Sequence, residues 1–181
     1  EAEAEARSRK TYLKNVSSSD VEIKQKQKQA EQDQQKRMKT IEISNLRRKK
    51  IIFDDRTTAL EAFENNSDAN VFLIRSSRDN TDLVFMLRNN QELKEIEIFL
   101  IVDEESNIQY KTEVKSGETT KHFQTDTLDM MIKELLKLEF HSGTVSQIKT
   151  DNKVETYNIS GNEVRALSGG SRKTRKKKVK R

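Results

Sequence analysis

An arginine directly after four apolar residues is the feature of the sequence with the clearest chemistry. Arg75 follows the run Val71-Phe72-Leu73-Ile74, and polar residues bound the whole stretch. Such a run predicts a central strand buried on both faces, in which Arg75 shares a face with Val71 and Leu73. Because an unpaired buried charge is costly, the Arg75 guanidinium needs an anionic partner.

Two identities are open for that partner. Arg75 could lie at the end of its strand, where it reaches solvent or pairs with a structural carboxylate. Alternatively, the partner is a ligand phosphate, whose oxygens a planar guanidinium binds in a bidentate manner. The second alternative is favoured by backbone N–H groups of the following turn and by the hydroxyls of Ser76, Ser77 and Thr81.

Residues 72–77, Phe-Leu-Ile-Arg-Ser-Ser, resemble the Phe-Leu-Val-Arg-Glu-Ser signature of Src homology 2 domains, which bind phosphotyrosine peptides. Two flanking segments follow in the order of the family. Residues 56–63 are similar to the family's first helix, and residues 128–132 resemble the start of its second helix. The resemblance covers about residues 50–150.

The resemblance implies a phosphotyrosine-peptide-binding adaptor or signalling module. Arg75 would bind the phosphate, together with Arg56 of the first helix, which in the family also reaches over the tyrosine ring. The residues expected to complete the phosphate site are Ser77, Ser76, Arg78 and Thr81. Peptide residues after the phosphotyrosine are expected to cross the strand of Phe99, with specificity set by Phe99, Ile98 and Leu100.

The sequence departs from the family's pattern in three places. It contains no tryptophan, although the family usually opens with a Trp-Tyr or Trp-Phe pair, and Lys49-Lys50 stand near that position. Ile98 stands where a histidine commonly lines the pocket, and Leu100 where many members have a lysine. A scaffold that keeps the fold without binding phosphate is therefore an alternative function.

The elements that must position these residues indicate an α+β fold. We predict a small central antiparallel sheet flanked by two helices, of the Src homology 2 kind, because a strand that is apolar throughout needs cover on both faces. In the first helix, from about 56 to 65 and capped by Asp54 or Asp55, Arg56 could also form a plain surface ion pair with these acids. The other expected elements are strands at 83–87, 96–102 and 108–114, a helix over about 127–138, and a hairpin of 145–149 with 154–159.

Charge is distributed unevenly along the chain. Residues 1–50 carry 14 Lys/Arg and 8 Asp/Glu, residues 51–170 carry 13 and 22, and the last eleven residues carry 8 basic and no acidic side chains. An acidic central region argues against a folded part that binds nucleic acid. We expect a polar arm at 1–48, helical or disordered, a folded domain with a C-terminal hairpin at 49–165, and a flexible basic tail at 166–181.

The basic tail supports the alternative to the adaptor. Residues 172–181 suit a nuclear import signal, or contact with nucleic acid or an anionic surface. A Gly-Gly hinge before a Lys/Arg tail also resembles the C-termini of many large DNA virus proteins. The alternative is a nucleic-acid-associated nuclear or virion protein that acts through basic tails. We expect an intracellular location, cytoplasmic or nuclear, in a host cell or virion.

Other classes of protein are not indicated. The chain has no cysteine, and its two histidines, His122 and His141, have no partner at metal-ligand spacing, so we expect no metal and no cofactor. It contains no Gly-rich phosphate loop and no nucleophile paired with a base, so we expect no enzyme. No apolar run approaches membrane-spanning length. The start at Glu1, without a methionine or a signal region, indicates a fragment or a processed product.

Overall fold

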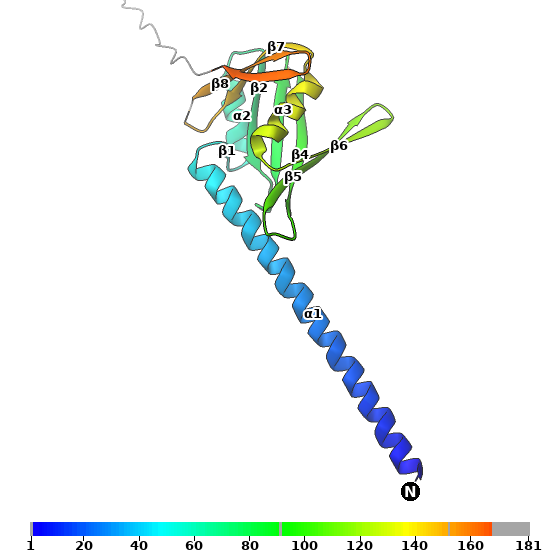
Figure 1. The fold of residues 1–181 in the computed structure, drawn as a ribbon. Helices are drawn as coiled ribbons and strands as arrows, with labels where there is room; N and C mark the ends of the chain where they lie inside the picture. The colour runs from blue at the N-terminus through cyan, green and yellow to red at the C-terminus, as the bar shows by residue number, and fades with distance from the viewer. Residues whose placement is uncertain (1, 91, 152, 168–181) are drawn as a thin grey trace, which may run out of the picture. The chain divides into compact units, whose positions relative to one another are not determined.

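The structure is a computed structural model that describes residues 2–90, 92–151 and 153–167, with side chains described for the same residues except 2–20 and 116. The chain divides between Met38 and Lys39 into two units. Helix α1 (Ala2–Arg48) supplies the first unit and contributes its last ten residues, 39–48, to the second (Figure 1). The remaining elements all belong to the second unit.

The second unit is built on one mixed sheet. Its strand order is β6-β5-β4-β3-β2-β7-β8-β9, and β1 pairs with β2 beside this path. Neighbouring strands are antiparallel except β1 with β2 and β2 with β7, which are parallel. The strands are β1 (Ile52–Phe53), β2 (Asn70–Ser76), β3 (Leu83–Asn89), β4 (Glu92–Val102), β5 (Ile108–Ser116), β6 (Thr119–Thr125), β7 (Ser142–Ile148), β8 (Val154–Ser160) and β9 (Glu163–Leu167).

Two short helices pack on opposite faces of this sheet. Helix α2 (Arg56–Glu64) starts at Asp55, whose side chain accepts a hydrogen bond from the Thr58 N–H, as the predicted acidic cap requires. Helix α3 (Leu128–Glu139) is capped in the same way by a threonine. Because side chains alternate along β2, Val71 and Leu73 pack with α2, whereas Phe72 and Ile74 pack with α3.

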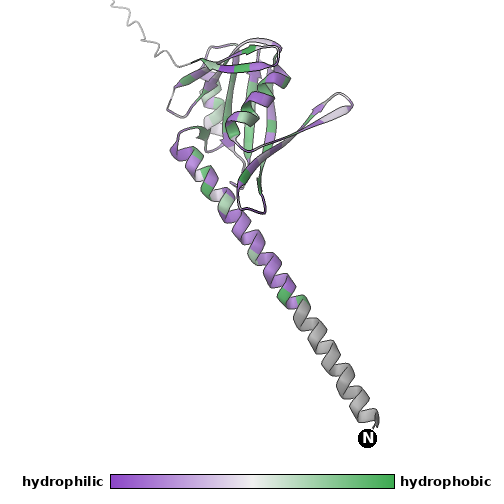
Figure 2. Ribbon diagram, in the orientation of Figure 1, coloured by the Kyte–Doolittle hydropathy of each residue, from purple (hydrophilic) through white to green (hydrophobic). Residues whose placement is uncertain are grey.

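The C-terminal part of α1 belongs to the core on the α3 side of the sheet. Ile43 and Leu46 are buried in the same cluster as α3. The Tyr110 hydroxyl of β5 donates a 2.7 Å hydrogen bond to Glu42, and its burial together with this carboxylate raises the pKa of Tyr110. Residues 21–37 of α1 are exposed instead, in keeping with the hydrophilic colour of this part in Figure 2.

The predicted fold class is wrong. The sheet has nine strands and is mixed, and the described part of the chain contains three helices, so it is not a small antiparallel sheet flanked by two helices. The error has a physical cause. The parallel pairs bring β2 next to segments that lie about 20 residues earlier and 70 residues later in the sequence. Local apolar patterns predict that a strand exists, but they do not encode such distant partners.

No helix among the described residues has both the length and the apolar character that crossing a bilayer requires.

A candidate anion-binding site

Arg75 lies near the end of β2, on the face that α2 covers, and its side chain is only 12% exposed. Its Nη2 donates to Glu95 Oε2 at 2.9 Å, and its Nη1 donates to the carbonyl oxygen of Ser76 at 3.1 Å. Its Nε lies 3.2 Å from the sulfur of Met86. The anion that faces Arg75 in this structure is therefore a carboxylate of the protein, which was the first of the two alternatives.

Arg56 reaches the same carboxylate from the first residue of α2. Its Nε donates to Glu95 Oε1 at 2.8 Å, and its side chain is 57% exposed. The ion pair expected for Arg56 is thus present, but with Glu95 of β4 in place of Asp54 or Asp55. Two guanidiniums from separate elements converge on the two oxygens of one carboxylate. We call Arg56, Arg75 and Glu95 the arginine-pair site.

Strand register places Glu95 next to the arginines. Leu73 pairs with Met86, and Met86 pairs with Glu95, so these three residues cross the sheet on the face of α2. The sequence analysis did not identify Glu95. Along β4, Glu95 lies on the face opposite to that of the buried Ile96 and Ile98. This alternation indicates which face Glu95 is on, but its nearness to the arginines also requires the strand alignment.

Two carboxylates at this end of the sheet have lowered pKa values. Partial burial raises the pKa of Glu95, but hydrogen bonds and charge from Arg56 and Arg75 outweigh it, so this pKa lies below its ordinary value. The pKa of Asp55 is also lowered, mainly by the Thr58 N–H and to a smaller extent by the charge of Arg75. At neutral pH, two positive and two negative charges therefore lie together at this end of the sheet.

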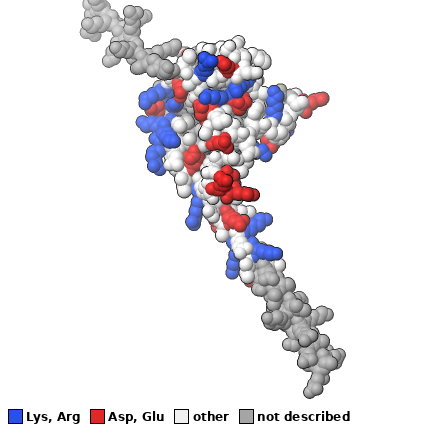
Figure 3. Space-filling model, viewed as in Figure 1, with Lys and Arg blue, Asp and Glu red and all other residues white. Residues whose placement is uncertain are grey.

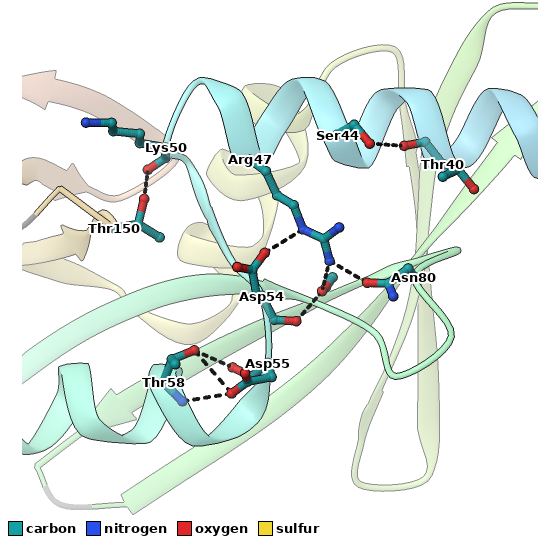
Figure 4. A network of polar contacts seen from close by, with 10 residues as sticks. Thr40, Ser44, Arg47, Lys50, Asp54, Asp55, Thr58, Asn80 and Thr150 are labelled. Carbon is teal, nitrogen blue, oxygen red and sulfur yellow. Dashed lines mark hydrogen bonds and ion pairs between the residues drawn. The ribbon is translucent and has the colours of Figure 1, made fainter.

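The hydroxyl of Ser76, which we expected in the phosphate site, points away from the Arg75 guanidinium, although the Ser76 carbonyl oxygen contacts it. Its side chain alternates to the opposite face and is 1% exposed. Its hydroxyl donates to the Asp54 carbonyl oxygen at 2.6 Å and accepts from Arg47 at 3.0 Å. Figure 4 shows how Arg47, which the sequence analysis missed, points toward Asp54 and Asn80.

The turn between β2 and β3 uses its hydroxyls for its own hydrogen bonds. Ser77 donates to Asp79 at 2.6 Å and accepts from the Asp82 N–H at 3.0 Å, while Thr81 donates to Asp82 at 3.0 Å. Ser77 and Thr81 also lower the pKa of Asp79. Arg78 is exposed and has no ion pair among the described residues. Ser77, Arg78 and Thr81 thus follow Arg75 in the chain, but none of them contacts its guanidinium in this structure.

Only one of the three expected specificity residues faces the surface. Phe99 is 41% exposed and lies on the same face of β4 as Glu95, together with the exposed Leu93. Ile98 and Leu100 are fully buried on the opposite face, in the cluster that includes α3. Phe99 therefore shares a face of β4 with Glu95 of the arginine-pair site, whereas Ile98 and Leu100 do not.

Comparisons with protein-family models, with curated proteins and with solved structures find no match.

A separate cleft of about 590 Å³ lies at the end of α2, and Asp68 and Arg88 are the charged residues that line it. Arg88 at its wall donates to the carbonyl oxygens of Phe63, Asn66 and Asp68 at 2.6 to 2.8 Å and lies over the Phe63 ring. The guanidinium thereby closes the C-terminal end of α2.

Among the described residues, no group of three or more His, Asp or Glu side chains is placed to hold a metal ion. Residues 172–181 lie outside the described residues, and so does the nucleic-acid contact expected of them.

Proposed function

We propose that this protein is a non-enzymatic module that binds a tyrosine-phosphorylated peptide at the arginine-pair site. In the bound state, the phosphate would take the place of the Glu95 carboxylate between Arg56 and Arg75. The supporting observation is the convergence of two guanidiniums from α2 and β2 on one carboxylate, at 2.8 and 2.9 Å. An intracellular location, cytoplasmic or nuclear, belongs to the same proposal.

Charge favours phosphate over carboxylate at this position. A phosphate monoester carries about −1.5 to −2 at neutral pH and offers three acceptor oxygens, whereas Glu95 contributes a single charge. Two guanidiniums match a dianion better than a monoanion. Each charge-assisted hydrogen bond contributes about 1.5–3 kcal/mol, and micromolar binding requires only about 8 kcal/mol.

Glu95 has room to leave the arginines. Its side chain is 30% exposed, and β5 pairs with β4 only from Phe99 onward. Because the Glu95 side chain is partly exposed, its carboxylate can rotate away from the arginines into solvent. Because the carboxylate gives up two ion pairs when it leaves, we expect weaker phosphate binding than at a site without it.

The depth of the site favours phosphotyrosine over phosphoserine. Arg75 is largely buried, so only a long side chain can carry a phosphate to it while the peptide backbone stays outside. Arg56 is exposed enough to contact the ring of such a side chain. Phe99 and Leu93, exposed on the same face, offer apolar surface to neighbouring peptide residues. The resemblance of residues 72–77 to the phosphotyrosine-binding signature points to the same ligand.

The same ion pairs favour a second candidate function. Arg56 and Arg75 hold β4 against α2 and β2 through Glu95, which is sufficient reason for both arginines to be present in a scaffold that binds no phosphate. Such a scaffold would present its surface to a partner irrespective of phosphorylation.

A peptide array distinguishes the two candidates. The full chain is applied to tyrosine peptides in phosphorylated and unphosphorylated form, and hits are titrated against Arg75→Ala and Arg56→Ala. The adaptor requires phosphorylation-dependent binding that falls at least tenfold in both variants. Arg165→Ala removes an exposed arginine ion pair from β9 and serves as the matched control, with unchanged binding. Equal binding to both forms of every peptide would support the scaffold.

A further inference from the structure

Basic side chains gather at the C-terminal end of α1, where Figure 3 shows a concentration of Lys and Arg. The N–H and the hydroxyl of Thr150 donate to the Lys50 carbonyl oxygen at 3.3 and 3.2 Å, which holds the turn between β7 and β8 against the end of α1 (Figure 4). The two segments together form what we call the basic cluster, consisting of Arg48, Lys49, Lys50, Lys149 and Lys153.

Most of the positive charge of the basic cluster is unpaired. Lys149 pairs with Glu155 at 2.6 Å, and Lys153 pairs with Asp151 at 2.9 Å. The pKa of Asp151 is lowered by its hydrogen bonds with Lys153 and, to a smaller extent, by the charges of Lys153 and Lys50, so Lys50 also lies near this carboxylate. Arg48, Lys49 and Lys50 are exposed, and none of them has an ion pair among the described residues. The end of α1 therefore presents three consecutive cations to solvent.

Lys50 occupies a backbone position that favours glycine. Its φ is +60°, in the left-handed region. Its N–H donates to the Arg47 carbonyl at 2.8 Å and the Ile51 N–H donates to the Leu46 carbonyl at 3.0 Å, the two bonds of a Schellman helix end. Glycine reaches this conformation without the steric cost that a side chain brings. A lysine here does not serve the stability of the turn, which indicates that its charge has another use.

The described chain ends at the same end of the sheet. Leu167, the last residue of β9, pairs with Thr156 of β8, close to the turn that carries Lys149 and Lys153. The residues after Leu167 include eight Lys/Arg and no acidic residue. Leu167, the end of the described chain, therefore lies near the basic cluster, because both are next to the start of β8.

We propose that the basic cluster binds the phosphate backbone of a nucleic acid. Lysine and arginine side chains contact successive phosphates and release the counterions condensed on them. The excess of acidic side chains in residues 51–170, 22 against 13 basic, argues against nucleic-acid binding by the folded part as a whole. The proposal differs from that expectation because it confines binding to the basic cluster, where the local charge is positive. Arg48, Lys49 and Lys50 are adjacent and exposed, so they match the row of phosphates along a nucleic-acid backbone.

Fluorescence anisotropy of the full chain tests this proposal, with a labelled duplex and a labelled single strand of mixed sequence as probes. The variant Arg48→Ala/Lys49→Ala/Lys50→Gly removes three cations. We expect its affinity at about 0.1 M salt to fall at least tenfold, and the slope of log affinity against log salt to shrink by about 2 to 3. The variant Lys111→Ala/Lys115→Ala/Lys121→Ala, on β5 and β6, removes the same charge elsewhere and should bind within twofold of the original chain.

The single variant Lys50→Gly distinguishes an effect of lost charge on binding from an effect of lost stability. We expect weaker binding together with an equal or higher melting temperature, because glycine fits the left-handed position better. Three results would overturn the proposal: equal binding by the cluster and control variants, binding of Lys50→Gly at full strength, or tighter binding of phosphatidylserine vesicles than of either nucleic acid. Phosphopeptide binding should be the same in all these variants, so this test is independent of the adaptor proposal.

Discussion

Glu95 occupies the position in which the proposed ligand would bind. Its carboxylate contributes one negative charge to two guanidiniums, and any phosphate has to compete with it. Because Glu95 is part of the same chain as the arginines, the competing carboxylate is present at every ligand concentration. In the proposed function, the charge on Glu95 would therefore set the phosphate affinity of the site.

Replacing Glu95 by glutamine should strengthen phosphate binding. Glu95→Gln keeps the shape of the side chain and removes its charge, so the arginines lose a competing anion. We expect about a tenfold gain in affinity, which corresponds to about 1.4 kcal/mol, for a phosphotyrosine peptide measured by calorimetry. Glu97→Gln changes a carboxylate on the same face of β4 that forms no ion pair with either arginine, and should leave the affinity unchanged.

The two alternatives for the site give different results in this experiment. If Glu95→Gln gains no affinity but the original chain does bind, Glu95 is not the competitor. If neither chain binds a phosphopeptide, and Glu95→Gln only lowers the melting temperature, the arginines hold β4 in place and the scaffold is the better description.

Acid should weaken the fold through the same residue. The pKa of Glu95 is lower in the folded chain than its ordinary value of 4.5, so its ion pairs contribute stability above that value. As the pH falls through the folded pKa, the carboxylate takes up a proton and this contribution is lost. We expect Glu95→Gln to show a shallower fall in urea midpoint between pH 6 and pH 3 than the original chain. Parallel curves would contradict the prediction.

At the scale of elements, the last turns of α1 contribute side chains to the folded core. Ile43 and Leu46 are buried against α3, and Glu42 accepts a hydrogen bond from Tyr110. The sequence analysis placed these residues in a polar arm because the helix has few apolar residues, and some of these, such as Val21 and Ile23, are exposed. Two buried residues one turn apart are enough to attach a helix, but they make too short a pattern to stand out in a long polar segment.

Shortening Ile43 should destabilise the second unit. Ile43→Ala removes apolar volume from a fully buried position, and such changes cost about 2–5 kcal/mol. Ile41→Ala is the matched control, because Ile41 is 61% exposed and its loss should change the free energy of unfolding by about 0.5 kcal/mol or less. Urea unfolding followed by circular dichroism measures both. Equal effects would show that α1 does not pack as described.

Local patterns predicted the individual elements better than their assembly. The helix after Asp55, the strand at Phe72 and the helix with Met131 and Leu135 on its inner face are all confirmed, because caps and apolar spacing act over a few residues. The sequence also showed that Arg75 needs an anionic partner. Its partner Glu95 was not visible in the sequence, because that contact depends on how β2, β3 and β4 are aligned.

At the scale of the whole molecule, the two proposed anion-binding surfaces lie on different parts of the folded unit. The arginine-pair site lies on the face of the sheet that α2 covers, and the basic cluster lies at the end of α1. Arg47 connects these regions, since it precedes the cluster in the chain and contacts Asp54 and Ser76 next to β2. A phosphopeptide and a nucleic acid would therefore use different side chains and could bind at the same time.

The division between Met38 and Lys39 leads to a prediction for the whole chain. Residues 21–37 of α1 are exposed, whereas residues 39–48 belong to the unit that contains the sheet. A chain that lacks residues 1–38 should keep the melting temperature of the full chain within about 2 °C. A chain that lacks residues 1–48 loses Ile43 and Leu46 as well, and removal of two buried side chains should lower the melting temperature by about 10 °C or more, or prevent folding.

Thermal unfolding followed by circular dichroism compares the two truncations. Equal melting temperatures would show that the end of α1 does not stabilise the sheet, and loss of folding in the shorter deletion would show that the exposed part of the helix is required.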